Sequence, residues 1–154
     1  MIKPDRIEDI GDIRVIGLNR TYTIENRGDI PGQWADWRYD QVCGVTADAV
    51  YGVSHGFRQS GQFDYMCALP VDRDAPVPED QSDLILPAGP YAIYVHQGHV
   101  SGIAKLFDAV LCGDGPGDGL IFTPTPQFEL YGDDFDPIKA VGKVELWFPV
   151  ARLS

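Results

Sequence analysis

The chain has 154 residues, 12 of them basic and 23 acidic, which gives a formal net charge of −11. A chain of this length fits one domain and can bury about 70% of the surface that it exposes when unfolded. Because nucleic-acid binding relies on Lys and Arg that neutralise phosphates, the negative charge argues against direct binding of nucleic acid.

Cysteine usage and hydropathy indicate a cytoplasmic protein. The three cysteines, Cys43, Cys67 and Cys112, are odd in number and form no CxxC pair, so we expect reduced, buried thiols rather than disulfides. The first residues lack the apolar core of a signal peptide. No apolar run approaches the roughly 20 residues that cross a bilayer, so we expect no membrane association.

The first half of the chain predicts one strand, one helix and two further strands. Residues 13–23 are rich in β-branched side chains and partly alternating, which indicates a strand. Ile30, Trp34 and Trp37 fall at i, i+4 and i+7 and predict an amphipathic helix over residues 28–39. Two shorter strand-like segments follow, residues 49–54 and 63–69.

The second half repeats this order of elements. An acidic, proline-containing connector over residues 72–85 leads to a strand-like segment at 91–96 and a helical pattern at 100–111. Two final strand-like segments follow, residues 127–131 and 143–150. The chain therefore predicts an α+β fold made of two β-α-β-β units.

Two dipeptides recur at similar offsets in the two halves and support an internal duplication. They are Tyr51-Gly52 with Tyr131-Gly132, offset by 80 residues, and Pro70-Val71 with Pro149-Val150, offset by 79. One helix and three strands cannot bury a sheet face alone, so the two units are expected to share a core. The seam between them is a natural place for a ligand cleft.

Several segments, taken in order, resemble the GyrI-like domain, also called the AraC-type effector-binding or multidrug-regulator ligand-binding domain. The matching segments are Val15-Ile-Gly-Leu18, Tyr51-Gly-Val53, Leu86-Pro-Ala-Gly-Pro-Tyr-Ala-Ile-Tyr94, Phe128-Glu-Leu-Tyr131 and Val144-Glu-Leu-Trp-Phe-Pro-Val150. The resemblance runs over residues 12–151 and makes the whole chain, 1–154, one such domain, with halves at 12–71 and 86–151. It implies a pseudo-two-fold antiparallel sheet with two helices and a central groove.

The resemblance also implies a function, the binding of an amphipathic, cationic organic molecule in an aromatic-lined groove. Glu129 matches the family's acidic residue that meets cationic ligands, and Glu145 matches a second recurring glutamate. Some free-standing members resemble hydrolases that open strained rings of electrophilic, alkylating compounds with a pocket glutamate, which leaves hydrolysis open, by Glu129 or Glu145. Other members inhibit gyrase by binding the protein, which leaves a protein partner open.

Regulators of this bacterial family carry a helix-turn-helix domain ahead of the ligand-binding domain. About a dozen residues precede the first expected strand here, so a free-standing member without a DNA-binding domain is expected.

Alternation within the strands places the candidate ligand residues. Glu129 lies between Phe128 and Leu130 and so points away from both, on the same face as Tyr131, which is a further expected ligand residue. In the last strand Glu145 shares a face with Trp147, and alternation leaves open which glutamate faces the groove. Tyr and Trp favour positions that are partly apolar and partly exposed to water, and their rings attract organic cations, so four aromatic residues are the expected walls of the ligand groove. They are Trp37, Tyr51, Tyr91 and Trp147.

The sequence indicates no metal site and no cofactor. His96 and His99 lack a third ligand nearby, and Asp114 and Asp118 do not fit the spacing of a calcium loop. Phosphate-loop, dinucleotide and nucleophile-elbow motifs are missing. Neither the ligand's identity nor the oligomeric state follows from these patterns.

Overall fold

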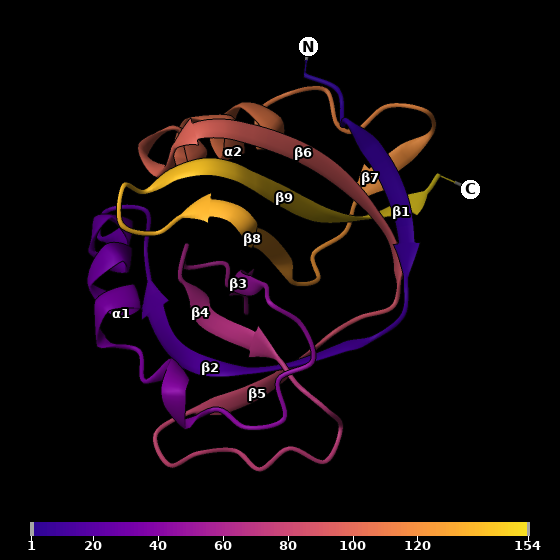
Figure 1. Cartoon of the computed structure of the whole chain (residues 1–154). Helices are drawn as coiled ribbons and strands as arrows, with labels where there is room; N and C mark the ends of the chain where they lie inside the picture. Colours follow the sequence, from indigo (N-terminus) through magenta and orange to yellow (C-terminus); the bar gives the residue numbers. More distant parts are fainter. Residues whose placement is uncertain (1, 154) are drawn as a thin grey trace.

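The computed structural model describes residues 2–153 as a curved antiparallel sheet that carries two helices (Figure 1). The helices are α1 (Ile30–Asp36) and α2 (Ile103–Leu111), and short 3-10 turns lie at Arg27–Asp29, Tyr39–Gln41 and Val100–Gly102. The strands are β1 (Arg6–Ile10), β2 (Ile13–Tyr22), β3 (Val50–His55), β4 (Phe63–Pro70), β5 (Ser82–Leu86), β6 (Gly89–His99), β7 (Leu120–Phe122), β8 (Gln127–Asp136) and β9 (Val141–Arg152). The strand order is β1-β6-β9-β8-β3-β4-β2-β5, and β7 pairs with β9.

The predicted duplication of β-α-β-β units is confirmed. The first unit is β2-α1-β3-β4 and the second is β6-α2-β8-β9. Strands β3 and β8 pair antiparallel at the centre of the sheet and join the two units, as a pseudo-two-fold axis requires. Strands β1, β5 and β7 are additions that the sequence patterns did not predict, and β5 lies in the segment expected to be a connector.

The register shows that one of the two repeated dipeptides is not a structural match. Tyr51 pairs with Leu130, whereas Gly52 pairs with Glu129, so Tyr51 and Tyr131 point to opposite faces of the sheet. The proline match holds, because Pro70 pairs with Val15 of β2 and Pro149 pairs with Tyr91 of β6. The tyrosines recur in the sequence but occupy different environments.

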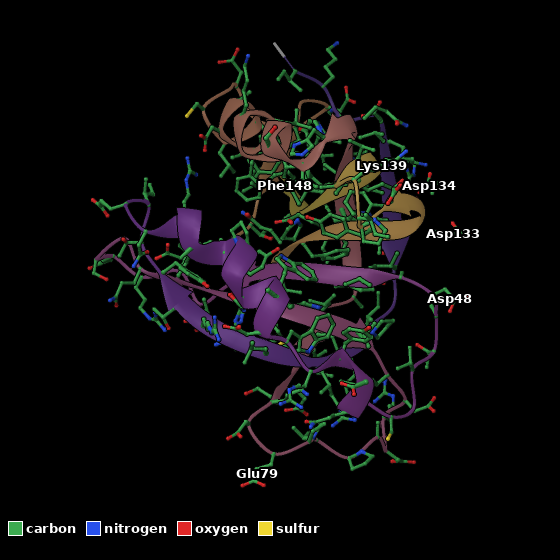
Figure 2. The ribbon with its side chains drawn as sticks, turned by 60° about the vertical axis from the view of Figure 1, so that its left-hand side comes forward. Asp48, Glu79, Asp133, Asp134, Lys139 and Phe148 are labelled. Carbon is green, nitrogen blue, oxygen red and sulfur yellow. The ribbon has the colours of Figure 1, made fainter. Side chains whose placement is uncertain are left out.

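Both helices cover the same face of the sheet, which we call the helix face. α2 packs its Ile103 and Val110 against Tyr94 and Phe148 of the second unit. Figure 2 shows Phe148 enclosed beneath α2, whereas Asp133 and Asp134 of the β8–β9 hairpin point outwards. α1 lies at the other end, beside β2 (Figure 1), over a cluster that includes Tyr22, Tyr65 and Cys67. The middle of the helix face, on β8 and β3, therefore lies between the two helices.

The opposite face, which we call the inner face, is buried by the curvature of the sheet. Its core joins side chains from strands that lie far apart in the strand order, because the sheet curls around them. They include Val15, Val53, Met66, Leu86, Tyr91, Ile93, Phe128 and Trp147. This face is a packed core.

Two smaller expectations need correction. Trp37 has an extended backbone (ψ 127°), so α1 ends at Asp36 and is shorter than the predicted helix over 28–39. Of the three cysteines only Cys67 is buried, while Cys43 and Cys112 are exposed. Among residues 2–153, neither helix is long and apolar enough to cross a membrane.

Candidate functional site

Glu129 lies in the middle of the helix face, held by two tyrosine hydroxyls. On β8 it pairs with Gly52 of β3 on one side and with Leu146 of β9 on the other. Its Oε1 accepts a hydrogen bond of 2.6 Å from the Tyr131 hydroxyl and one of 3.0 Å from the Tyr65 hydroxyl. Two separate strands, β4 and β8, thus supply donors to one carboxylate oxygen.

Burial and the two hydroxyls act on Glu129 in opposite directions. Burial raises the pKa of Glu129, and the hydrogen bonds from Tyr131 and Tyr65 oppose that rise because they stabilise the charged form. Burial, reinforced by the negative charge of Glu129, raises the pKa of Tyr65 and Tyr131 well above the usual value for tyrosine. Both hydroxyls therefore stay protonated near neutral pH and remain donors.

The indole of Trp34 packs over these tyrosines. Its ring centroid lies 5.6 Å from that of Tyr131 and 6.2 Å from that of Tyr65, both edge-to-face. Trp34 is half-buried and borders both of the tyrosines that hold the carboxylate. Glu129, Tyr65, Tyr131 and Trp34 together are called the Glu129 site below.

A fully buried glutamine fixes the helix that carries Trp34. The amide nitrogen of Gln33 donates to the carbonyls of Leu18 (2.8 Å) and Tyr65 (2.7 Å), and its oxygen accepts from the Tyr22 hydroxyl (2.7 Å). These three bonds tie α1 to β2 and β4, because a buried amide left unpaired costs free energy. The position of Trp34 is therefore defined by the sheet beneath α1.

Glu145 has a different environment from Glu129. It is 8% exposed and lies on the inner-face side of β9, where it accepts a hydrogen bond from Trp147 Nε1 (3.1 Å). Arg6 of β1 forms an ion pair with it at 2.8 Å, and Lys143 approaches to 3.7 Å. The charge of Glu145 is thus neutralised within the protein. Among residues 2–153, Glu129 has no such cationic partner.

The structure brings some of the predicted aromatic ligand residues to Glu129 and keeps others away. Tyr131 is in direct contact with Glu129 through its hydroxyl. Trp37 does not reach Glu129 directly: its ring packs 5.8 Å from that of Trp34, and its buried indole donates a hydrogen bond to Gln81. The remaining three pack on the inner face around Phe128. They are Tyr51, Tyr91 and Trp147, with ring centroids 5.2, 5.5 and 5.2 Å from Phe128.

Tyr65, Trp34 and Gly52 were not predicted as site residues. Tyr65 pairs with Ser54, and Gly52 separates it from Glu129, so their proximity depends on the pairing of three strands. Trp34 belongs to the apolar side of the predicted helix, with Ile30 and Trp37. This pattern predicts that Trp34 faces the core but does not identify the residues that it contacts.

Two hollows lie away from Glu129. One of about 310 Å³ is lined by residues that include Ile13, Arg14 and Ile85, and one of about 190 Å³ lies beside Tyr91 and Pro149. Neither contains a group with the features of Glu129, a half-buried carboxylate without a cationic partner among residues 2–153. We therefore assign the candidate site by its chemistry.

Comparisons with known proteins agree with this fold. The family model of the GyrI-like small molecule binding domain matches residues 5–151. The transcriptional regulator BrlR of Pseudomonas aeruginosa is 30% identical over 150 residues, which cover 94% of this chain and 54% of BrlR. The chain thus spans about half the length of that relative.

Solved structures show the same fold at low sequence identity. SAV2435 bound to tetraphenylphosphonium has a TM-score of 0.70 at 19% identity, over 95% of this chain and 93% of SAV2435. A bacterial transcription regulation protein from Staphylococcus aureus MU50 has a TM-score of 0.67 at 19% identity, over 94% and 96% of the two chains. The chain belongs to the GyrI-like small-molecule-binding domain family.

Proposed function

We propose that the Glu129 site binds an amphipathic organic cation, with Glu129 as the charge partner. The observation that carries the proposal is a half-buried carboxylate held by two neutral hydroxyls and, within residues 2–153, by no Lys or Arg. A carboxylate removed from water is costly unless an opposite charge and hydrogen bonds compensate it. The tyrosines supply the hydrogen bonds, and the ligand supplies the missing positive charge.

The walls of the site suit the apolar part of such a ligand. Trp34, Tyr65 and Tyr131 present aromatic rings around the carboxylate, and aromatic faces attract organic cations as well as apolar groups. The indole of Trp37, 5.8 Å from that of Trp34, extends this aromatic surface. SAV2435, which shares the fold, has been solved with tetraphenylphosphonium, a phosphonium cation that bears four phenyl groups.

Hydrolysis of an electrophilic ligand is the second candidate function. It is favoured by the raised pKa of Glu129, because a raised pKa makes a carboxylate a stronger general base towards water. The two functions differ in one observable. A binding protein leaves the ligand chemically unchanged after prolonged incubation. A hydrolase releases a product, and the Glu129→Gln variant should no longer form it.

Calorimetric titration tests the binding proposal. The ligands are tetraphenylphosphonium and triphenylphosphine oxide, a neutral aromatic molecule of related shape. Glu129→Gln keeps the shape of the side chain and removes its charge. Losing one partner of a desolvated charge pair costs about 2–5 kcal/mol, or roughly 30- to several thousand-fold in cation affinity. The neutral ligand should bind both proteins almost equally.

Glu145→Gln is the matched control, since the charge of Glu145 is already neutralised by Arg6. It should leave the affinity for tetraphenylphosphonium near that of the wild type. Equal losses for cation and neutral ligand in Glu129→Gln, or a selective loss of the cation in Glu145→Gln, would contradict the proposal.

A further inference from the structure

Gly52 occupies the position on β3 directly between Glu129 of β8 and Cys67 of β4. Its backbone does not require glycine, because it lies within a regular strand and is not among the positive-φ glycines. Glycine in a strand interior weakens the strand and often marks a place where another group approaches closely. At Gly52 the group that approaches is the side chain of Tyr65.

The ring of Tyr65 crosses β3 at Gly52. Tyr65 stands on β4 and its hydroxyl reaches Glu129 on β8, so the side chain has to span the intervening strand. A Cβ atom at position 52 would overlap the Tyr65 hydroxyl and would lie 2.9 Å from Tyr65 Cζ and 3.0 Å from Glu129 Oε1. Any side chain at this position would therefore push the hydroxyl away from the carboxylate.

We propose that Gly52 is a positioning residue of the Glu129 site: its missing side chain lets the Tyr65 hydroxyl reach Glu129 and keep the carboxylate charged for a cationic ligand. The consequence for ligands rests on the proposed function, whereas the positioning of Tyr65 does not. Gly52 touches no ligand in this account and acts through Tyr65.

The sign of the effect follows from the hydrogen bonds. The Tyr65 and Tyr131 hydroxyls lower the pKa of Glu129 against the rise caused by burial. In Gly52→Ala the Tyr65 hydroxyl is displaced and only the Tyr131 bond remains. The protonated form of Glu129 then persists to higher pH, and a cation loses its partner charge earlier as pH falls.

The experiment is an NMR titration of the Glu129 side-chain carboxyl in the ligand-free protein, with its signal assigned by its absence in Glu129→Gln. Gly52→Ala and Tyr65→Phe should each raise the titration midpoint by about one pH unit, because each removes a hydrogen bond to a charged group. The double variant should shift no further than Tyr65→Phe alone, since both changes remove the same bond. The pH at which tetraphenylphosphonium binding is half lost should shift by the same amount as the titration midpoint of the Glu129 carboxyl in each of these variants.

Gly132→Ala is the control for the loss of a strand glycine. Gly132 lies on β8 near Glu129, its φ is not positive, and a Cβ there would meet Asp134 Oδ1 at an ordinary 3.5 Å. It should leave the Glu129 midpoint unchanged. An unchanged midpoint in Gly52→Ala, or shifts that add in the double variant, would overturn the proposal.

Folding provides a second test. Tyr65→Phe removes the hydroxyl oxygen, which is the atom that the new Cβ would overlap most closely. If Gly52→Ala fails to fold, the double variant should fold, and a double variant that also fails would overturn the proposal. If the carboxyl titration shifts as expected but no variant changes tetraphenylphosphonium binding, the positioning role of Gly52 stands and the proposed function fails.

Discussion

The partial burial of Glu129 predicts that its contribution to the stability of the ligand-free protein falls as pH rises. In the unfolded chain the carboxyl ionises at the ordinary glutamate pKa of about 4.3. In the folded protein burial raises the pKa of Glu129, although the two tyrosine hydroxyls oppose the rise. Between these two pKa values the native state keeps a proton that the unfolded state has released. The contribution of Glu129 is thus fully present below the unfolded pKa and is lost as pH rises through the native pKa.

The size of the effect depends on the separation of the two pKa values. Each unit of separation lowers the free energy of unfolding by about 1.4 kcal/mol, a sizeable part of the roughly 5–15 kcal/mol that stabilises a domain. Urea unfolding of wild type and Glu129→Gln, at pH steps from about 4 to 8, measures it. The difference between the two curves isolates Glu129, because the other acidic residues are common to both proteins.

Glu25→Gln is a control for the sign of this effect. Glu25 is exposed, and hydrogen bonds from its own backbone and from Thr23 lower the pKa of its carboxyl. Its contribution therefore has the opposite dependence on pH. A wild-type minus Glu129→Gln difference that stays flat from pH 4 to 8, or that grows with pH, would refute the desolvation of Glu129 on which the site assignment depends.

Two further predictions concern residues around the two glutamates. An aromatic cation at the Glu129 site should change the tryptophan emission, and Trp34→Phe should abolish most of that change while Trp147→Phe retains it, because Trp147 packs on the inner face. Arg6→Ala leaves Glu145 without its nearest cation and should lower the free energy of unfolding by about 1–2 kcal/mol in urea unfolding, less than a fully buried pair since the Arg6 side chain is 39% exposed. An Arg6→Ala protein with weakened tetraphenylphosphonium binding would show that the two glutamates are coupled.

Local periodicity was sufficient to predict the duplicated fold but not its additions. The order of two β-α-β-β units follows from alternating strands and helical stripes such as Ile30, Trp34 and Trp37. β5 lies in an acidic, proline-containing segment, and it becomes a strand because β2 offers it an edge to pair with. β1 likewise forms by pairing with β6, a strand that lies about 80 residues further along the chain. Both depend on tertiary contacts that short sequence windows do not contain.

The candidate site could be predicted only within single strands. Alternation correctly places Glu129 and Tyr131 on one face, and Glu145 and Trp147 on one face. It does not say which face carries the helices, and the structure puts these two pairs on opposite sides of the sheet. The neutralisation of Glu145 comes from Arg6 on β1, a strand that the sequence did not predict. The contact of Tyr65 with Glu129 depends on the register of β4, β3 and β8.

Proton release on ligand binding tests most directly whether Glu129 is the charge partner. A cation that pairs with Glu129 favours its ionised form, so binding near the native pKa of Glu129 should expel protons from the site. Titration of tetraphenylphosphonium in two buffers with different ionisation enthalpies counts them. We expect proton release from the wild type and none from Glu129→Gln. The same release from both proteins, or tight binding of the cation by the wild type without any release at that pH, would contradict the assignment of Glu129.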